Sequence, residues 1–428
     1  MSIFILLVGG FITKILSFVI RVIYTRAIGD IGINLYTIVA PTYSLFITLA
    51  SFSLPISISK LVSENIIKRK KIVFSAISFI LLFNVGLIFL VLLLAPFIAE
   101  NLLKQPTVTP LIYAMAFTLP FISISSILKG YFLGKLKVAP NTISNIFEQL
   151  IRILFLIFLL PLLVKKDLML GVVSYILFNI ITEIVSIFTF WLFLPKKGKV
   201  IKSDLIPEKN IIYRILKISV PSVSGRLIGN IGFFLEPIIL TNVLLLNGYQ
   251  NSYILQEYAS YNAYAIGLLT MPSFFIAAIC QILIPEVSKY QAEKNITMLK
   301  RRLKQALFYS FLIGITCSLI LFFFRNPILN IVYNTTRGSD YIFALAPFFV
   351  LFYLEAPLSS ALQALDESKK AMQITLIGSI IKMIIMTVLG FCKIGLFALV
   401  ISEIINIIIV VYLNFKNVKK AIHKIKMA

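Results

Sequence analysis

Long uninterrupted apolar runs constrain this chain more than any other feature. The segment ISFILLFNVGLIFLVLLLAPF (Ile77–Phe97) is apolar on every face, and similar runs recur along all 428 residues. A helix of about 20 residues crosses the roughly 30 Å hydrocarbon core of a bilayer, whereas a strand of a membrane barrel would alternate in polarity over about ten residues. The sequence therefore predicts an all-α polytopic membrane protein.

Polar connections separate the apolar runs into about twelve predicted transmembrane helices. The runs cover residues 3–25, 33–58, 73–97, 108–130, 142–164, 169–194, 215–244, 260–285, 304–324, 341–363, 372–391 and 396–414. The longest polar connection lies between the sixth and seventh runs. We therefore expect an N-terminal six-helix lobe (1–197), a cytoplasmic linker (198–213) and a C-terminal six-helix lobe that ends in a basic tail (214–428).

The distribution of positive charge predicts the orientation of the chain. Of its 40 Lys and Arg residues, 28 fall in connections on one side of the predicted spans and 7 in connections on the other. Short cytoplasmic loops carry the excess of Lys and Arg, so both termini are expected in the cytoplasm and the protein in the cytoplasmic membrane. The net charge of +23 is thus a topology signal and does not indicate nucleic-acid binding, for which no soluble domain is present in the sequence.

Three pairs of similar segments occur in the same order in the two predicted lobes. The pairs are SKLVSE (Ser59–Glu64) with SKYQAE (Ser288–Glu293), SSILKGYFLGK (Ser125–Lys135) with SSALQALDESK (Ser359–Lys369), and ITEIVSI (Ile181–Ile187) with ISEIINI (Ile401–Ile407). Duplicated halves are common in membrane transporters. Because each copy would contain six spans, the two lobes are expected to be parallel repeats.

Ten charged residues fall inside the predicted spans, apart from Lys129, Lys217 and Lys304 at the span ends, which are counted with the connections. The ten are the bases Lys14, Arg21, Arg152, Arg226 and Lys382 and the acids Glu148, Glu183, Glu236, Glu355 and Glu403. At about 2.5 to 3.5 kcal/mol each near the bilayer centre, ten lipid-facing charges would cost roughly 25 to 35 kcal/mol. That exceeds the stability of a typical domain, about 5 to 15 kcal/mol, so these side chains must face one another or a watered cavity.

Spacing along the chain suggests partners for some of these charges. Lys14 and Arg21 are two turns apart, so they share one face of the first span, which has no carboxylate. Glu148 precedes Arg152 by four residues, the favourable order for an ion pair within one helix. Arg226 follows a Pro- and Ser-rich stretch that suits the lining of a cavity.

Each of these residues also has a purely structural interpretation. Snorkelling to the outer interface is the alternative for Arg21. Glu183 lies four residues from Asn179 and Glu403 three residues from Asn406, so both acids favour structural roles. We take as candidate substrate-binding residues Lys14, Arg21, Glu148, Arg152, Arg226, Glu236 and Lys382.

Neither an enzyme nor a cofactor site is predicted. Cys280, Cys317 and Cys392 have no spacing typical of a metal site or a disulfide framework, and they are interpreted as packing residues. GYFLGK (Gly130–Lys135) is too short for a phosphate-binding loop and lacks its Ser or Thr. The single histidine, His423, lies in the basic tail, far from any predicted intramembrane site.

Two N-terminal segments resemble a known group of transporters. They are RAIGDIGINLYTIVAPTYSLFITLASFSLPISISKLVSE (Arg26–Glu64) and SSILKGYFLGKLKVAPNTISNIFEQLIRI (Ser125–Ile153). Both are similar to the polysaccharide flippase branch of the multidrug/oligosaccharidyl-lipid/polysaccharide superfamily. Within this branch they resemble the stage V sporulation protein B group and, more distantly, the lipid II flippases. The resemblance implies two six-helix lobes around a cavity that opens alternately to each side. It also implies export of an undecaprenyl-pyrophosphate-linked sugar, with Lys14 and Arg226 meeting the pyrophosphate.

Three functions remain open from the sequence. The first is a flippase for a lipid-linked oligosaccharide or cell-wall precursor, working as a monomer and coupled to H⁺, to Na⁺ or to no ion. The second is an ion-coupled multidrug antiporter that exports cations on the same scaffold and relies on Glu148 or Glu236. The third is a membrane scaffold without transport activity, which would have little need for unpaired cations at mid-depth.

Overall fold

The chain folds as bundles of long helices. The computed structural model describes residues 2–64, 67–194 and 206–427, and within these ranges the regular elements are all helical. Eleven helical stretches in the described ranges are long and apolar enough to cross a membrane, and the first of them, Val8–Glu64, contains the first two predicted spans. The prediction of an all-α membrane protein with about twelve spans is confirmed.

The first two spans are joined by a bend instead of a loop. Helix α1 (Ser2–Ser51) leaves helical geometry at Gly29, where φ is 64° and ψ is −173°. A positive φ with extended ψ is essentially restricted to glycine, so this residue turns the chain without ending the helix. After a short break at Phe52 and Ser53, helix α2 (Leu54–Glu64) continues the second span.

The chain divides into two compact units, Met1–Phe234 and Leu235–Ala428. The division falls inside helix α9 (Lys209–Leu246), so the last residues of the predicted linker, 209–213, are helical. Residues 198–205 of that linker lie outside the described ranges. The lobe boundaries drawn from the sequence stay a prediction.

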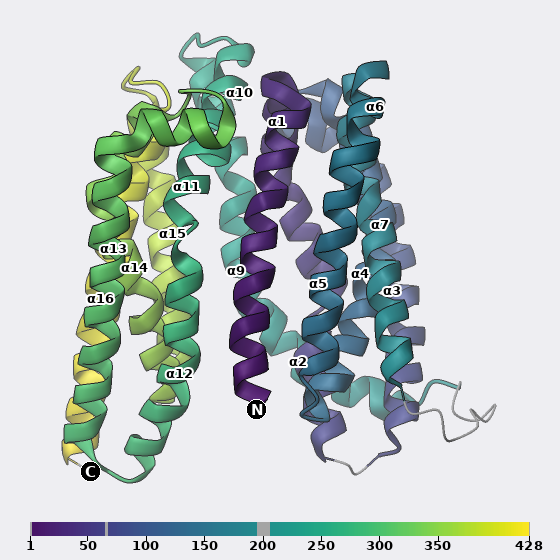
Figure 1. Ribbon diagram of the computed structural model, residues 1–428, viewed down its shortest axis with the longest axis vertical. Coiled ribbons are helices and arrows are strands. Elements are labelled where there is room, and N and C mark those ends of the chain that lie inside the picture. Colours follow the sequence, from purple (N-terminus) through teal and green to yellow (C-terminus); the bar gives the residue numbers. More distant parts are fainter. Residues whose placement is uncertain (1, 65–66, 195–205, 428) are drawn as a thin grey trace. The chain divides into compact units, whose positions relative to one another are not determined.

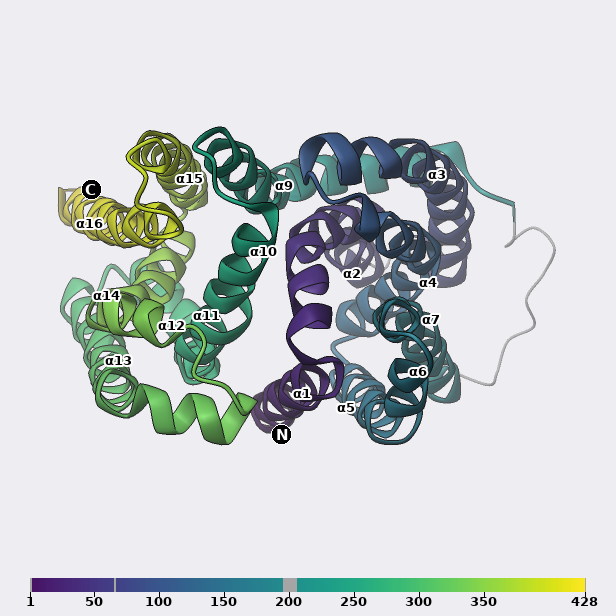
Figure 2. The same cartoon turned by 90° about the horizontal axis from the view of Figure 1, so that it is seen from above.

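Unit 1 is organised around α4. Its elements after α2 are α3 (Arg69–Phe97), η1 (Ile98–Leu102), η2 (Pro106–Val108), α4 (Thr109–Gly134), α5 (Ala139–Leu154), η3 (Phe155–Leu159), α6 (Leu160–Lys166), α7 (Leu168–Phe193) and the first part of α9 (Figure 1). Helix α4 packs against α1, α2, α3 and α7 (Figure 2). This central position explains why α4 is the most buried of the single spans in this unit.

Two glycines let α4 approach α2 closely. A Cβ added at Gly130 would lie 2.9 Å from the backbone of Pro55, and one at Gly134 would lie 2.5 Å from the carbonyl oxygen of Ser59. Glycines four residues apart let membrane helices pack with their backbones in near contact. GYFLGK is therefore a helix-packing segment.

We expect Gly134→Ala to destabilise the protein by about 1–3 kcal/mol, because the new methyl group overpacks a contact with rigid backbone. A lower thermal unfolding midpoint of the purified protein in detergent would show it. Gly86→Ala in α3 is the matched control, because a Cβ there meets nothing within 4 Å. If both variants unfold with the wild type, the close approach of α2 and α4 does not stabilise this fold.

Unit 2 is organised around α14. After the end of α9 come α10 (Asn251–Ala259), the π-helical turn η4 (Ser260–Ala265), α11 (Ile266–Thr270), α12 (Ser273–Ala292), α13 (Ile296–Tyr333), α14 (Ser339–Ala364), α15 (Ser368–Gly390) and α16 (Phe397–Met427). Helix α14 packs against α12, α13, α15 and α16 (Figure 1). The predicted eighth span is thus a broken helix that runs from α10 to α12.

Matched segments of the sequence repeat occupy matched places in the two units. In unit 1, SKLVSE ends α2 and packs on SSILKGYFLGK in α4. In unit 2, SKYQAE ends α12 and packs on α14, where Ser288 Oγ donates to the carbonyl oxygen of Ala364 at 3.2 Å. The same pairing of segments within each unit supports a duplicated origin.

Candidate functional site

Glu148 lies at the interface of α5 with α4 and pairs with a base from α4. Its carboxylate is 3.2 Å from Lys129 Nζ and accepts a hydrogen bond from Ser144 Oγ at 3.3 Å. Only 7% of Glu148 is exposed. Sequence spacing suggested Arg152 as its ion-pair partner, and the structure differs: the neighbouring helix supplies the partner instead.

Arg152 reaches across from α5 to polar side chains of α7. One of its terminal nitrogens donates to Asn179 Oδ1 at 2.8 Å and to Thr182 Oγ1 at 3.1 Å. The side-chain oxygen of Asn179 therefore accepts from Arg152. Glu183, which the sequence spacing paired with Asn179, instead accepts a hydrogen bond from Ser125 of α4. Arg152 is half-buried and held by neutral groups, and its charge also acts on the carboxylate of Glu183.

Arg21 lies beside a cluster of tyrosines. Tyr24 and Tyr175 stack with ring centroids 3.7 Å apart, and Tyr36 meets both rings edge-on. The charges of Arg21 and Arg152 both act on Tyr36 and Tyr175. Two guanidinium groups from different helices therefore converge on one aromatic cluster within unit 1.

Lys14 and Arg226 are the exposed bases of this set. Within the part of the chain that the structure describes, neither side chain forms a hydrogen bond or an ion pair. One turn after Arg226, Asn230 accepts from Ser44 Oγ at 2.8 Å and donates to Thr48 Oγ1 at 2.9 Å, which ties α9 to α1. Arg226 is thus held on an anchored helix with its charge unpartnered.

Lys382 sits between two carboxylates in unit 2. Its Nζ lies 2.5 Å from Glu236 of α9 and 2.5 Å from Glu403 of α16, and its side chain is 17% exposed. Three helices are therefore joined by one ammonium group. Glu403 does not depend on Asn406 as the sequence spacing suggested.

The broken eighth span supplies further donors to Glu236. Tyr258 Oη of α10 donates to Glu236 Oε1 at 3.2 Å, and Asn262 of η4 donates to the same oxygen at 3.5 Å. Breaks in regular helix at membrane depth persist where they are buried in protein or line a cavity, and π-helical turns are frequent at functional sites. The end of α10 and the π-helical turn η4 therefore place two donors at one carboxylate.

Glu355 adds a further acid to unit 2. It is half-buried in α14, and the charge of Glu403 acts on it. Within the described ranges its carboxylate has no hydrogen bond or ion pair. Those ranges contain no group of three or more Cys, His, Asp or Glu side chains arranged to hold a metal ion.

The charges inside the spans separate by sign between the units. Unit 1 contains the bases Lys14, Arg21, Arg152 and Arg226 with the acids Glu148 and Glu183, whereas unit 2 contains the base Lys382 with the acids Glu236, Glu355 and Glu403. Because Lys129 already neutralises Glu148, unit 1 keeps a surplus of positive charge. Unit 2 keeps a surplus of negative charge.

A known family accounts for a chain of this architecture. Residues 1–291, more than half of the chain, match the family model described as polysaccharide biosynthesis protein. The chain belongs to this family. Residues 259–388 also match the MatE model, so this chain is a member of the multidrug/oligosaccharidyl-lipid/polysaccharide superfamily, as its N-terminal segments predicted.

Curated relatives match this chain over nearly its whole length. Stage V sporulation protein B of Bacillus subtilis is 30% identical over 98% of this chain and 83% of its own length. Lipid II flippase MurJ of Bacillus subtilis is 23% identical over 89% of this chain and 75% of its own length. These relatives, with the helical spans, place the chain among multi-pass membrane transporters of the superfamily.

Solved structures share the fold. An inward-facing multidrug resistance MATE family transporter superposes with a TM-score of 0.80 at 14% identity, over 97% of this chain and 96% of its own. A superfamily transporter from Pyrococcus furiosus, described as having a binding pocket of reverse polarity that suggests a different function, gives a TM-score of 0.68 at 15% identity over 99% and 96%. At these identities the likeness concerns the fold alone.

Proposed function

We propose that this chain is a flippase that exports an undecaprenyl-pyrophosphate-linked oligosaccharide or cell-wall precursor across the cytoplasmic membrane by alternating access. The observation that carries the proposal is the surplus of positive charge in unit 1, above all the unpartnered Lys14 and Arg226. Uncompensated cations inside spans are costly in the absence of an anion. A pyrophosphate headgroup supplies that anion during transport.

The chemistry of the bases suits a diphosphate. A guanidinium group binds phosphate oxygens through two parallel hydrogen bonds, and a lysine ammonium binds them as a point charge. Arg21 and Arg152 provide two guanidinium groups beside tyrosine rings, whose faces suit the stacking of a sugar or the guanidinium itself. The name of one relative, lipid II flippase MurJ, agrees with a lipid-linked substrate.

Export of cationic drugs is the second candidate, favoured by the surplus of acids in unit 2. The two carboxylates that the sequence suggested for it, Glu148 and Glu236, are already paired with Lys129 and Lys382. Among the acids inside the predicted spans, Glu355 is the one left without a hydrogen bond or ion pair within the described residues, so it is available for a cationic substrate or a coupling ion such as H⁺ or Na⁺. A paired carboxylate must release its resident cation before it binds another, which weakens this candidate.

Transport assays on the purified protein separate the two functions. In proteoliposomes we expect the wild-type chain to translocate the headgroup of a polyprenyl-pyrophosphate-linked saccharide, detected by its accessibility to an impermeant enzyme. The same vesicles should not export a fluorescent cationic dye above the rate of protein-free vesicles. Dye export without headgroup translocation would reverse the assignment.

A further inference from the structure

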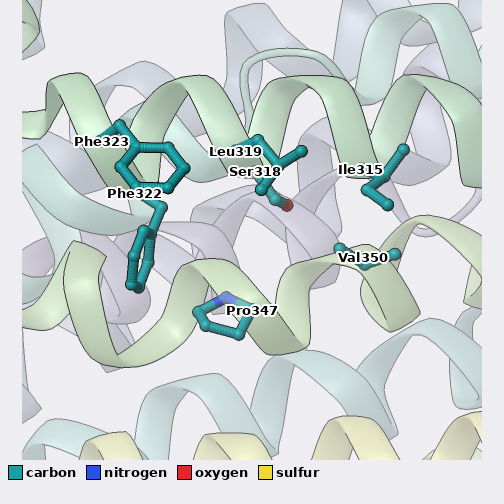
Figure 3. A pocket seen from close by; sticks show the side chains of 7 residues that line it. All are labelled: Ile315, Ser318, Leu319, Phe322, Phe323, Pro347 and Val350. Carbon is teal, nitrogen blue, oxygen red and sulfur yellow. The ribbon is translucent and has the colours of Figure 1, made fainter.

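A groove between α13 and α14 lies outside the charged clusters described above. Its volume is about 170 Å³, and its walls come from Ile315, Ser318, Phe322 and Phe323 of α13 and from Pro347 and Val350 of α14 (Figure 3). Ser318 is the one polar residue of this lining. The rest of the wall is hydrocarbon, so the groove suits a hydrocarbon occupant.

The rim of the groove faces outward. Leu319 is 50% exposed and Phe323 is 68% exposed, and both belong to a span long and apolar enough to cross a membrane. Apolar side chains this exposed on a spanning helix contact lipid chains. The rim of the groove is therefore an exposed apolar surface of the kind that suits lipid chains.

A positive charge marks one end of the groove. Two residues beyond Phe323, the guanidinium group of Arg325 lies 4.6 Å from the centre of the Phe343 ring. It donates to Ser339 Oγ at 3.1 Å and to the carbonyl oxygen of Phe322 at 2.8 Å. Within the described residues it forms no ion pair, so these contacts fix its position and leave its charge uncompensated.

The backbone explains why Arg325 sits at this end. Helix α13 leaves helical geometry at Phe324, where φ is −108° and ψ is 22°, and Pro327 follows. A proline inside a helix removes one hydrogen bond and kinks the axis. The kink ends the straight part of α13 next to the groove and places Arg325 where the span turns.

We infer that the groove binds an acyl chain of an anionic phospholipid and that Arg325 binds its phosphate. From Ile315 to Phe323 the helix rises about 12 Å, and these residues fall in the second half of the predicted span 304–324, so we place the groove within one leaflet of the roughly 30 Å hydrocarbon core. That length covers much of a single acyl chain but only a small part of a polyprenyl chain. The site lies wholly in unit 2 and uses none of the bases proposed to bind the transported substrate.

The single tryptophan of the chain allows a local test. Trp191 is replaced by Phe and Phe323→Trp is introduced as a reporter at the groove, in vesicles of phosphatidylcholine with a minor fraction of brominated phosphatidylglycerol. Quenching reports the local fraction of the brominated lipid. One interfacial charge should enrich it about five-fold over the bulk.

Three comparisons decide the inference. Arg325→Gln in the reporter background should return quenching to the bulk value, whereas Lys393→Gln, which removes an exposed charge elsewhere in unit 2, should not. Trp191 of the wild-type chain, 63% exposed on α7, should report the bulk value. Leu319→Trp, in the Trp191→Phe background with Phe323 retained, gives a second reporter should Phe323→Trp perturb folding.

Two results would overturn the inference. One is equal quenching with and without Arg325→Gln. The other is displacement of the brominated lipid by a few mole per cent of polyprenyl phosphate, which would make the isoprenoid chain the occupant. The Arg325→Gln variant should still translocate the headgroup of the transported substrate. A failure of the lipid-binding inference can therefore be told apart from a failure of the proposed transport function.

Discussion

Lys382→Met is expected to destabilise unit 2 by about 3–5 kcal/mol, because it leaves Glu236 and Glu403 facing each other without their shared cation. For a unit of this size that corresponds to a fall of roughly 6 to 20 °C in the unfolding midpoint. Differential scanning fluorimetry of the purified protein in detergent measures it. The ammonium is 17% exposed, so solvent screens little of this effect.

Two controls show whether charge is the cause. Adding Glu236→Gln and Glu403→Gln to Lys382→Met removes the uncompensated charges and should restore most of the midpoint. Lys370→Met, on the same helix, breaks the more exposed pair with Glu367 and should cost less than about 1 kcal/mol. A Lys382→Met protein that unfolds with the wild type would show that the triad does not hold the three helices together.

The double substitution Lys14→Gln with Arg226→Gln is expected to weaken binding of a soluble-tailed polyprenyl pyrophosphate at least a hundredfold. Each charge-assisted hydrogen bond contributes about 1.5–3 kcal/mol, and every 1.4 kcal/mol is a factor of ten in affinity. Titration calorimetry in detergent measures the change. Stability should stay unchanged, because neither side chain has a partner within the described residues.

The matched control for this binding experiment is Lys165→Gln with Lys166→Gln. Both lysines are exposed at the end of α6, and their loss changes the net charge equally. Their removal should reduce affinity less than threefold, since exposed charges are screened over about 10 Å in 0.1 M salt. An equal loss of affinity in the two double variants would mean that net charge, and not a site, attracts the headgroup.

Sequence patterns predict the spans of this protein well because few backbone structures are possible in the hydrocarbon core of a bilayer. A segment such as Ile77–Phe97 must satisfy its own backbone hydrogen bonds, so an apolar run of this length forms a helix. The joint between the first two spans was harder to predict. Gly29 in RAIGDIGIN looked like part of a loop, whereas one glycine with positive φ turns the helix there.

The partners of the charged residues could not be predicted, because spacing along one helix shows only neighbours on that helix. Glu148 points toward Lys129 on α4, and Lys382 toward acids on α9 and α16. Lys129 lies at the end of the predicted span 108–130 and its charge was counted with the cytoplasmic connection, although α4 continues past it to Gly134. Its position in SSILKGYFLGK, next to two glycines four residues apart, was the available signal that this segment is a packed helix.

The separation of charge by unit also required the structure. Five bases and five acids within spans balance along the sequence, and only the division at Phe234 and Leu235 shows that unit 1 has a surplus of bases and unit 2 a surplus of acids. The surplus in unit 1 suits an anion, and the surplus in unit 2 suits a cation. The summed charge within the spans, which is zero in the sequence count, gives no expectation about the substrate, whereas its distribution between the units does.

Headgroup translocation by the Lys14→Gln/Arg226→Gln variant is the measurement that most directly tests recognition of the pyrophosphate by unit 1. Wild type, this variant and the Lys165→Gln/Lys166→Gln control would be reconstituted at equal protein-to-lipid ratio, and the initial rate of headgroup exposure followed for the same polyprenyl-pyrophosphate-linked saccharide. We expect the rate to fall at least tenfold at subsaturating substrate for the first variant and to stay within twofold of wild type for the control. A first variant that transports at the wild-type rate would contradict recognition of the pyrophosphate by unit 1.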